Sequence, residues 1–386
     1  ARARVFYALT MQMGDIPYSQ TNQGADAVYK PTYDSQLDVL VGVLNELEEA
    51  SSYFADGYQF TGDPTPYNGD PEKWRRATNA FELQVLLSLS EKTDITDLDV
   101  VNRFRNIVSE GYLLEESTGF YGLEYSDLNR HPLSGTNPIF TSKTIISSLL
   151  LDNLKALNDR RFYYFGEPAG AQIDNGWTET DPEAYVGVDV EMDYSEMNAG
   201  HSNNEYSLLN YRYLQEYATE PRILMSFAEQ QFILAEARIL GWITQGTARE
   251  YYESGVRSAL AQTMKVNSAY AHGMAIDQDY IDGYFTGEAV FKATDQEQLE
   301  QVWMQKYFIN FMQDPRTSFF EYRRTGFPDF PINPATSLNV EAPEKIPMRW
   351  LYPSSESTLN RENLVEALDR QYDGYDEINK IMWLLQ

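Results

Sequence analysis

Apolar residues recur at intervals of three and four positions early in the chain. Over residues 34–51 this spacing places them on one face of a helix. Ser35 is followed three residues later by Asp38, which fits a capping box at the start of that helix. The pattern therefore predicts an amphipathic helix over about 34–51. Its apolar face consists of Leu37, Leu40, Leu44 and Leu47.

A second amphipathic helix is predicted over about 71–91. Asp70 is placed to cap it, and Pro71 occupies the first helical position. Proline is tolerated there because a backbone N–H at that position would have no partner within the helix. Its apolar face consists of Trp74, Ala77, Phe81, Val85 and Leu89. Two more helices are predicted over about 96–110 and about 141–158.

The clearest pair of helices lies at about 221–265. A helix beginning at Pro221 is expected through PRILMSFAEQQFILAEARIL, followed by the turn GWITQG and a second helix through TAREYYESGVRSALAQTM. Small residues at the facing positions fit a tetratricopeptide-like unit, in which two antiparallel helices pack closely. One unit cannot bury its own apolar face, so we expect the pair at about 34–91 to stack on it. A capping box at Thr294 predicts a further helix to about Gln313.

Three regions show no helical or strand period: about 112–140, 159–219 and 325–358. Loops of this length in a compact domain usually carry function or lie bound to a rigid body. No break in composition separates one part of the chain from another. We therefore expect a single domain over residues 1–386, built as one helical body decorated by long loops.

Composition and charge exclude several classes of protein. The 386 residues carry 30 Lys and Arg against 58 Asp and Glu, a formal net charge of −28. Such a surface repels nucleic acid and anionic lipid, since both are bound through basic side chains. No run of about 18 apolar residues is present to span a bilayer. The absence of cysteine excludes disulfides and thiol catalysis within this chain.

An aromatic-rich segment, FYYFGEPAGAQIDNGWTETDPEAYVGV at 162–188, contains the candidate ligand-binding residues. Its first four rings form an apolar run expected to dock the segment onto the helices. Trp177 is different, because it lies among polar residues with no apolar neighbour. A ring beside amides and carboxylates can stack on a sugar while the polar groups bind its hydroxyls. The candidate ligand-binding residues are Trp177, Asn175, Tyr185, Tyr164 and Asp174.

The sequence offers little catalytic chemistry. His131, His201 and His272 are isolated, and no nucleophile-elbow, dinucleotide-binding or P-loop motif occurs. Carboxylate pairs such as Asp181 and Glu183 leave a carbohydrate-active hydrolase open as an alternative, although 58 acidic residues produce such pairs by chance. No catalytic residue is assigned.

Metal binding has one weak candidate. The alternating carboxylates Asp189, Glu191 and Asp193 are weak calcium candidates, but they lack the glycine and the distal glutamate of an EF-hand. A solvated acidic edge is the favoured interpretation, and no cofactor is expected.

Several blocks carry a resemblance to a known family. GDIPYSQ (14–20) is followed in order by LKALNDRRFYYFGEPA, ILMSFAEQQFILAEARILGW, FFEYRRTGFP and IPMRWLYPSSESTLN. This succession, which extends to residue 360, resembles the SusD/RagB family of nutrient-binding outer-membrane lipoproteins and is most similar to its SusD-like branch. Within it, Arg323 and Arg324 are expected to pair with carbonyls and local acids, with a ligand carboxylate as the alternative.

The resemblance implies a fold and a function. Members are all-α proteins, in which tetratricopeptide-like helix pairs support a loop-rich, irregular ligand-binding half. They face the cell exterior through a lipidated N-terminal cysteine, and they deliver oligosaccharides, or peptides in the RagB branch, to a SusC-like TonB-dependent transporter. They are not enzymes. The signal peptide, lipidation site and first helices are expected upstream of this chain. A peptide-binding RagB-type relative and a helical-repeat scaffold for a protein partner remain alternatives.

Overall fold

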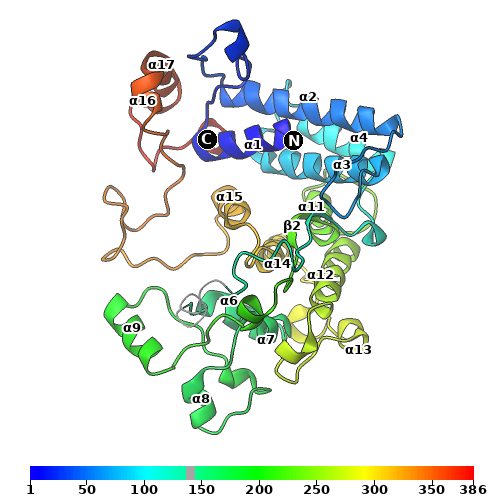
Figure 1. The fold of residues 1–386 in the computed structure, drawn as a ribbon, viewed down its shortest axis with the longest axis vertical. Coiled ribbons are helices and arrows are strands. Elements are labelled where there is room, and N and C mark those ends of the chain that lie inside the picture. The colour runs from blue at the N-terminus through cyan, green and yellow to red at the C-terminus, as the bar shows by residue number, and fades with distance from the viewer. Residues whose placement is uncertain (136–143) are drawn as a thin grey trace.

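The computed structural model describes residues 1–135 and 144–386. Helices dominate the described part of the chain, which holds one small antiparallel sheet of two strands. Figure 1 shows the N-terminal helices at one end and a loop-rich half at the other. The expected all-α fold with tetratricopeptide-like helix pairs is confirmed. Residues 136–143 lie outside the described part of the chain. They include the end of the region predicted irregular at 112–140 and the start of the helix predicted at 141–158.

The first layer consists of α1 (Arg2–Met13), α2 (Gln36–Ala55), α3 (Pro71–Ser88) and α4 (Val100–Glu110). Its helices pack in chain order, each against the next. The expected caps are present: Ser35 accepts a hydrogen bond from the Asp38 N–H, and Asp70 accepts from the N–H groups of Glu72 and Lys73. Local sequence therefore sets where these helices begin.

The second layer consists of α11 (Phe227–Ile239), α12 (Ala248–Met264), α14 (Asp295–Ile309) and α15 (Pro315–Thr325). α11 and α12 form the predicted pair, and α11 also contacts α3 and α14. The predicted stacking of the two helix pairs is thus confirmed at the contact of α3 with α11. The capping box of Thr294 with Glu297 is also present.

The predicted helix start at Pro221 is wrong. Residues Arg222–Ser226 form strand β2, which pairs antiparallel with β1 (Phe120–Leu123), and the helix begins only at Phe227. The register shifts between Tyr121 and Gly122. A Cβ on Gly122 would lie 2.0 Å from the Arg222 carbonyl oxygen, so glycine permits this close approach. The Ser226 side chain then caps α11 by accepting from the Glu229 N–H.

The loop-rich half contains short helices, of which the first lies within the helix predicted at about 141–158 and the rest lie where the sequence predicted none. They are α6 (Ser148–Ala156), α7 (Arg161–Phe165), α8 (Gly170–Asp174), α9 (Tyr194–Ser202), α10 (Arg212–Gln215) and α13 (Gln278–Asp282). Isolated bridges join segments distant in sequence, including Gly166 to Leu209 and Ser147 to Val188. The region predicted irregular at 159–219 is therefore a set of short helices connected by turns and bridges.

The C-terminal segment returns to the first layer. After α15 the chain runs without a helix until α16 (Glu356–Leu359), as predicted for 325–358, and α17 (Arg361–Tyr372) follows. The Tyr352 hydroxyl donates to the Asp15 carbonyl at 2.6 Å, and Arg370 pairs with the Asp15 carboxylate at 2.5 Å. Short 3-10 helices are η1 (Gly24–Asp26), η2 (Ser90–Lys92), η3 (Glu116–Thr118), η4 (Pro182–Ala184), η5 (Ser268–Tyr270), η6 (Gly287–Ala289) and η7 (Trp383–Leu385).

Helix α11 contributes to both clusters of buried apolar residues. Ile233 and Ala237 belong to the cluster of the first layer, whereas Phe232 and Ala235 belong to the cluster that includes α6, α7 and α12. The two halves are therefore packed on opposite sides of one helix. This arrangement gives the loop-rich half a rigid support, while the single domain over 1–386 remains a prediction.

Candidate ligand-binding site

Four consecutive aromatic residues anchor the candidate site. Phe162, Tyr163, Tyr164 and Phe165 form most of α7 and are all buried, as the sequence predicted. The rings of Phe165 and Phe311 lie 4.4 Å apart between centroids. The start of the aromatic segment is thus fixed to the helical body by apolar burial, which stabilises a residue of this size by roughly 2–3 kcal/mol.

Tyr185 and Tyr164 were predicted to contact ligand, and the structure buries both. Tyr185 is fully buried, with edge-on ring contacts to Phe162 and Tyr163 at 5.0 Å. Tyr164 is 1% exposed, and its hydroxyl accepts from the Ile276 N–H. The η4 turn directs the Tyr185 ring back onto α7, and Ala184 beside it is buried as well. Five rings therefore hold the segment, and Trp177 alone of the six is exposed.

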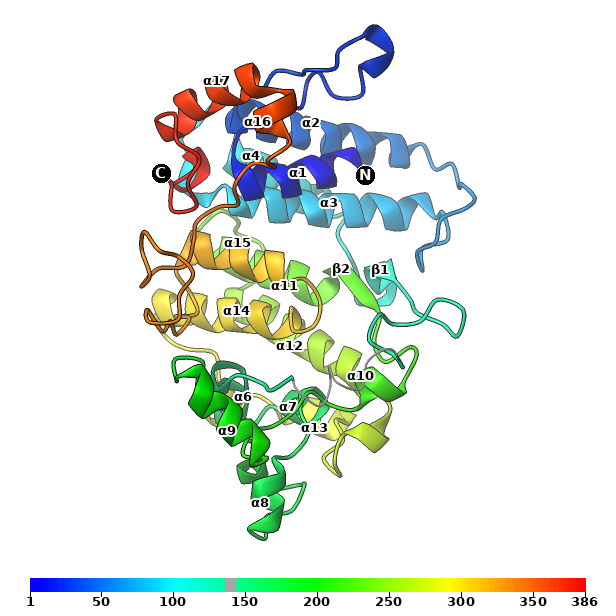
Figure 2. The same cartoon turned by 60° about the vertical axis from the view of Figure 1, so that its left-hand side comes forward.

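The exposed part is a short turn that we call the tip loop (residues 174–181). Figures 1 and 2 place α8, which leads into this loop, at the end of the molecule farthest from the first layer. Gly176 has φ +98°, a backbone conformation that L side chains rarely adopt. It lets the chain turn so that the Trp177 N–H donates to the Gln172 carbonyl. The Trp177 side chain is 43% exposed.

The hydroxyl groups of two buried tyrosines hold the tip loop by hydrogen bonds to its backbone. The Tyr163 hydroxyl donates to the Thr180 carbonyl at 2.7 Å, and the Tyr185 hydroxyl donates to the Glu179 carbonyl at 2.9 Å. Burial raises the pKa of Tyr163 to about 12, so its hydroxyl stays a donor at neutral pH. Tyr185 therefore acts on the candidate site by positioning the loop. A ring held this way loses little conformational freedom when a ligand binds.

Polar groups surround the exposed ring. Asp174 and Asn175 are exposed, and within the described residues neither side chain has a hydrogen-bond partner. The Thr178 hydroxyl donates to Asp181, and hydrogen bonds from Thr178 lower the pKa of that carboxyl. The loop thus offers one flat apolar surface flanked by free amide and carboxylate groups. This combination suits a polyhydroxylated ligand, whereas the acidic side chains disfavour an anionic one.

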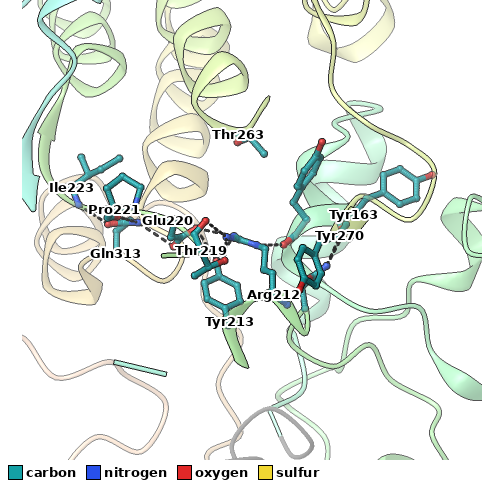
Figure 3. A network of polar contacts seen from close by, with 12 residues as sticks. Tyr163, Arg212, Tyr213, Thr219, Glu220, Pro221, Ile223, Thr263, Tyr270 and Gln313 are labelled. Carbon is teal, nitrogen blue, oxygen red and sulfur yellow. Dashed lines mark hydrogen bonds and ion pairs between the residues drawn. The ribbon is translucent and has the colours of Figure 1, made fainter. Parts of the chain in front are cut away.

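A polar network around the buried Arg212 links the segment at 210–220 to α7 (Figure 3). The Arg212 Nε donates to the Tyr164 carbonyl at 2.8 Å, and its Nη2 pairs with Glu220 at 2.7 Å. The Asn210 side-chain amide donates to the carbonyls of Tyr163 and Tyr270. Buried charges are tolerated only when paired in this way. The network therefore holds the backbone of α7 at the carbonyls of Tyr163 and Tyr164.

An aromatic groove is a further candidate surface, which was not predicted from the sequence. Its volume is about 340 Å³, and its walls come from α6, α14, α15, the turn between the last two helices, and the loops at 330 and 346. Asn310 and Ser318 supply polar side chains. Phe319 and Tyr322 lie three residues apart, which places both rings on one face of a helix, and this spacing could have indicated the groove in the sequence. The ring-bearing residues of the groove are Tyr307, Phe311, Phe319, Tyr322 and Phe330.

The geometry offers no support for a calcium site. Within the described residues, no three His, Asp or Glu side chains gather closely enough to hold a metal ion. The Asp189 carboxylate instead accepts a hydrogen bond from the Glu191 N–H, and Asp193 precedes α9. The three candidate residues are exposed, as a solvated acidic edge requires.

The two arginines of the RRTG block are structural. Arg323 donates to the carbonyls of Met348 and Met11, and Arg324 pairs with Glu236 at 2.7 Å and Glu321 at 2.8 Å. The pairing with carbonyls and local acids is thus confirmed. The carboxylates around Arg324 hold α11 and α15 together.

The histidines also have structural surroundings. His131 lies against the ring of Tyr125 at 5.1 Å, and burial lowers its pKa. His272 lies between Glu167 and Glu179, at 3.4 and 3.5 Å from their carboxylates. It therefore connects the tip loop with the segment that follows α7.

Comparison with known proteins gives a consistent result. A family model described as starch-binding and associating with the outer membrane matches residues 1–353. A SusD homolog from Bacteroides fragilis is 36% identical, with a TM-score of 0.94 over all of this chain and 82% of that one. A Bacteroides vulgatus structure, whose name assigns it to the outer membrane and to nutrient binding, is 34% identical with a TM-score of 0.90, over all of this chain and 83% of that one.

One of the less similar solved structures is named for the ligand that it binds. A chitin-binding protein is 25% identical, with a TM-score of 0.76 over 99% of this chain and 78% of that one. A comparison with curated proteins gives no match. Among the described residues, no helix is both long and apolar enough to cross a bilayer.

Proposed function

The chain belongs to the SusD-like family, whose members bind nutrients, and we propose that this one captures a glycan at the cell surface without chemical turnover. The tip loop is proposed as its main contact with the glycan. The proposed ligand-binding residues are Trp177, Asn175 and Asp174, while Tyr163 and Tyr185 position the loop.

The single observation that carries the proposal is the exposed Trp177 ring on a loop held from below by buried phenols. An indole costs free energy in water unless something covers it, and a sugar covers it with its CH face. The family description names starch, and the name of one similar structure names chitin. Both are neutral polymers, and the free acidic and amide groups beside the ring favour a neutral ligand.

Family membership supports a proposal for the partner and the location. We propose that the protein is anchored to the outer membrane by a lipid and passes its ligand to a SusC-like TonB-dependent transporter. Capture then has to be weak enough for release, which favours a shallow exposed loop over a closed pocket. A peptide ligand of the RagB type is the second candidate, and affinity for a polymer panel distinguishes it.

Native affinity electrophoresis tests the proposal. The protein is run through gels containing starch, a soluble chitin derivative or other neutral polysaccharides, and peptide binding is measured in parallel by calorimetry. We expect at least one polysaccharide to retard the protein and to be recovered at unchanged chain length. Binding of peptides without any retardation would contradict the glycan assignment. Turnover abolished by one Asp or Glu substitution would contradict the absence of catalysis.

A further inference from the structure

A cavity of about 600 Å³ lies between the first layer and the loop-rich half. It is lined by residues from α1, the β1–β2 sheet and the facing ends of α12 and α14. Exposed Glu124, Ala218 and Lys265 stand at its rim, whereas Arg161 and Ala259 in its wall are buried. Its volume falls within the range of about 300–1,000 Å³ that is usual for ligand pockets. The tip loop contributes no residue to it.

Unsatisfied hydrogen-bond donors occur in the wall of this cavity. Arg161 is 2% exposed, and its Nε and Nη2 bind Asp159 and Gln305, but among the described residues its Nη1 has no partner. Arg4 likewise donates from Nη2 to the Leu224 carbonyl, while its Nη1 has no partner in the part of the chain that the structure describes. A buried donor without an acceptor costs about 1–3 kcal/mol. An oxygen-bearing ligand or water in the cavity would complete both groups.

Acceptors and charges in the wall indicate that this ligand is neutral. Glu229 and Asp314 line the cavity together with Arg4, and both carboxylates act electrostatically on that guanidinium. The Arg212 side chain is already paired with Glu220, whose second oxygen accepts from Gln313 (Figure 3). A carboxylate or phosphate ligand would therefore meet acidic groups as well as the arginines. Hydroxyl groups, which both donate and accept, fit such a mixed wall.

Aromatic rings supply the apolar part of the wall. Phe120, Phe165 and Phe311 line the cavity, and the rings of the last two lie against each other at 4.4 Å. Rings of this kind cover the CH faces of a pyranose, while the polar groups bind its hydroxyls. The cavity therefore combines the two kinds of contact that a sugar needs.

We propose that this cavity is a second ligand site that holds the end of a neutral oligosaccharide, with Arg4 and Arg161 donating to its hydroxyls. The inference rests on the proposed function, because it takes the ligand to be a glycan. It places chain-end binding in the cavity and binding along the polymer at the tip loop.

Calorimetric titration with a short oligosaccharide tests this inference. The oligosaccharide is prepared from a polymer that retards the full chain in the affinity gels. Wild type is expected to show two classes of site. Ala261→Phe narrows the cavity from α12 and is expected to weaken one class at least tenfold, about 1.4 kcal/mol, whereas Trp177→Ala is expected to remove the other. Gln262→Trp, which blocks the cavity from a half-buried position, is a second variant in case Ala261→Phe fails to fold.

The outcomes separate the two proposals. Loss of all binding in Trp177→Ala, with full affinity in both cavity variants, would overturn the second site and leave the proposed function intact. Retention of both classes of site in both cavity variants would also overturn it. If no polysaccharide retards the wild-type protein, the proposed function fails and the second site fails with it. A matched control, Ala248→Phe at the other end of α12 and outside the cavity wall, is expected to bind like wild type.

Discussion

Trp177 and Tyr185 lie eight residues apart in one segment, yet one ring is exposed and the other is fully buried. The difference comes from long-range packing, because Tyr185 meets Phe162 and Tyr163, more than twenty residues earlier in the chain. Nothing in the residues next to Tyr185 marks it as a core residue. This is why the exposed Trp177 could be predicted from its polar neighbours while the burial of Tyr185 could not.

The positioning role of Tyr185 gives a prediction at this scale. Tyr185→Phe removes the hydrogen bond to the Glu179 carbonyl and keeps the ring contacts. We expect the free energy of unfolding to fall by about 1 kcal/mol, the usual net value of one such bond. Glycan affinity should fall less than threefold, since the ring is fully buried and is not proposed to contact the ligand. A loss of affinity as large as that of Trp177→Ala would show that Tyr185 contacts the ligand after all.

A buried carboxyl in α3 gives a second prediction. Glu82 is 1% exposed, and within residues 1–135 and 144–386 its Oε1 has no hydrogen-bond partner. Burial raises its pKa to about 8, with further contributions from Glu48 and Glu110 that outweigh the opposing Arg103. The folded protein therefore keeps this proton to a higher pH than the unfolded chain, where the pKa is about 4.3.

The sign of the effect follows from that difference. The stabilising contribution is complete below about pH 4.3 and is lost as the pH rises to about 8, at up to about 1.4 kcal/mol per pH unit. Glu82→Gln stays neutral throughout. Thermal unfolding between pH 5 and pH 8.5 should show that the variant gains stability over wild type as the pH rises. A constant difference across this range would contradict the raised pKa.

At the scale of elements, helices with local signals were predicted well. Asp70 with Pro71 and Thr294 with Glu297 mark helix starts through contacts within four residues, and the structure has those starts. Residues Arg222–Ser226 were assigned to a helix because their strand partner, β1, lies about a hundred residues earlier. The aromatic groove was missed for the same reason, since residue 330 meets α14 and α15 only through the fold.

The α11–α12 pair depends on one small residue. A Cβ on Gly255 would lie 2.6 Å from the Phe232 ring, so these helices approach closely at that point. Gly255→Ala is expected to lower the free energy of unfolding by about 1–3 kcal/mol through overpacking. Chemical denaturation of Gly255→Ala, Phe232→Leu and the double variant measures the coupling. The double variant should be more stable than the sum of the single effects, and strict additivity would argue against the close contact.

At the scale of the whole molecule, the dominant property is the net charge of −28. Like charges repel one another across the folded surface, and salt screens that repulsion. We expect the midpoint of thermal unfolding to rise between 10 and 300 mM sodium chloride, about a fivefold change in Debye length. Affinity for a neutral glycan should change less than twofold over the same range. A steep fall of affinity with salt would instead indicate a charged ligand.

The central claim is that a glycan is held by the ring that the tip loop presents. The most direct measurement is the dissociation constant of the retarding polysaccharide, by affinity electrophoresis, for wild type, Trp177→Ala and the control Tyr194→Ala. Tyr194 is 74% exposed at the start of α9, outside the tip loop. We predict that Trp177→Ala weakens binding roughly tenfold or more, about 1.4 kcal/mol, at unchanged thermal stability, while Tyr194→Ala binds like wild type. Full affinity in Trp177→Ala would contradict the account.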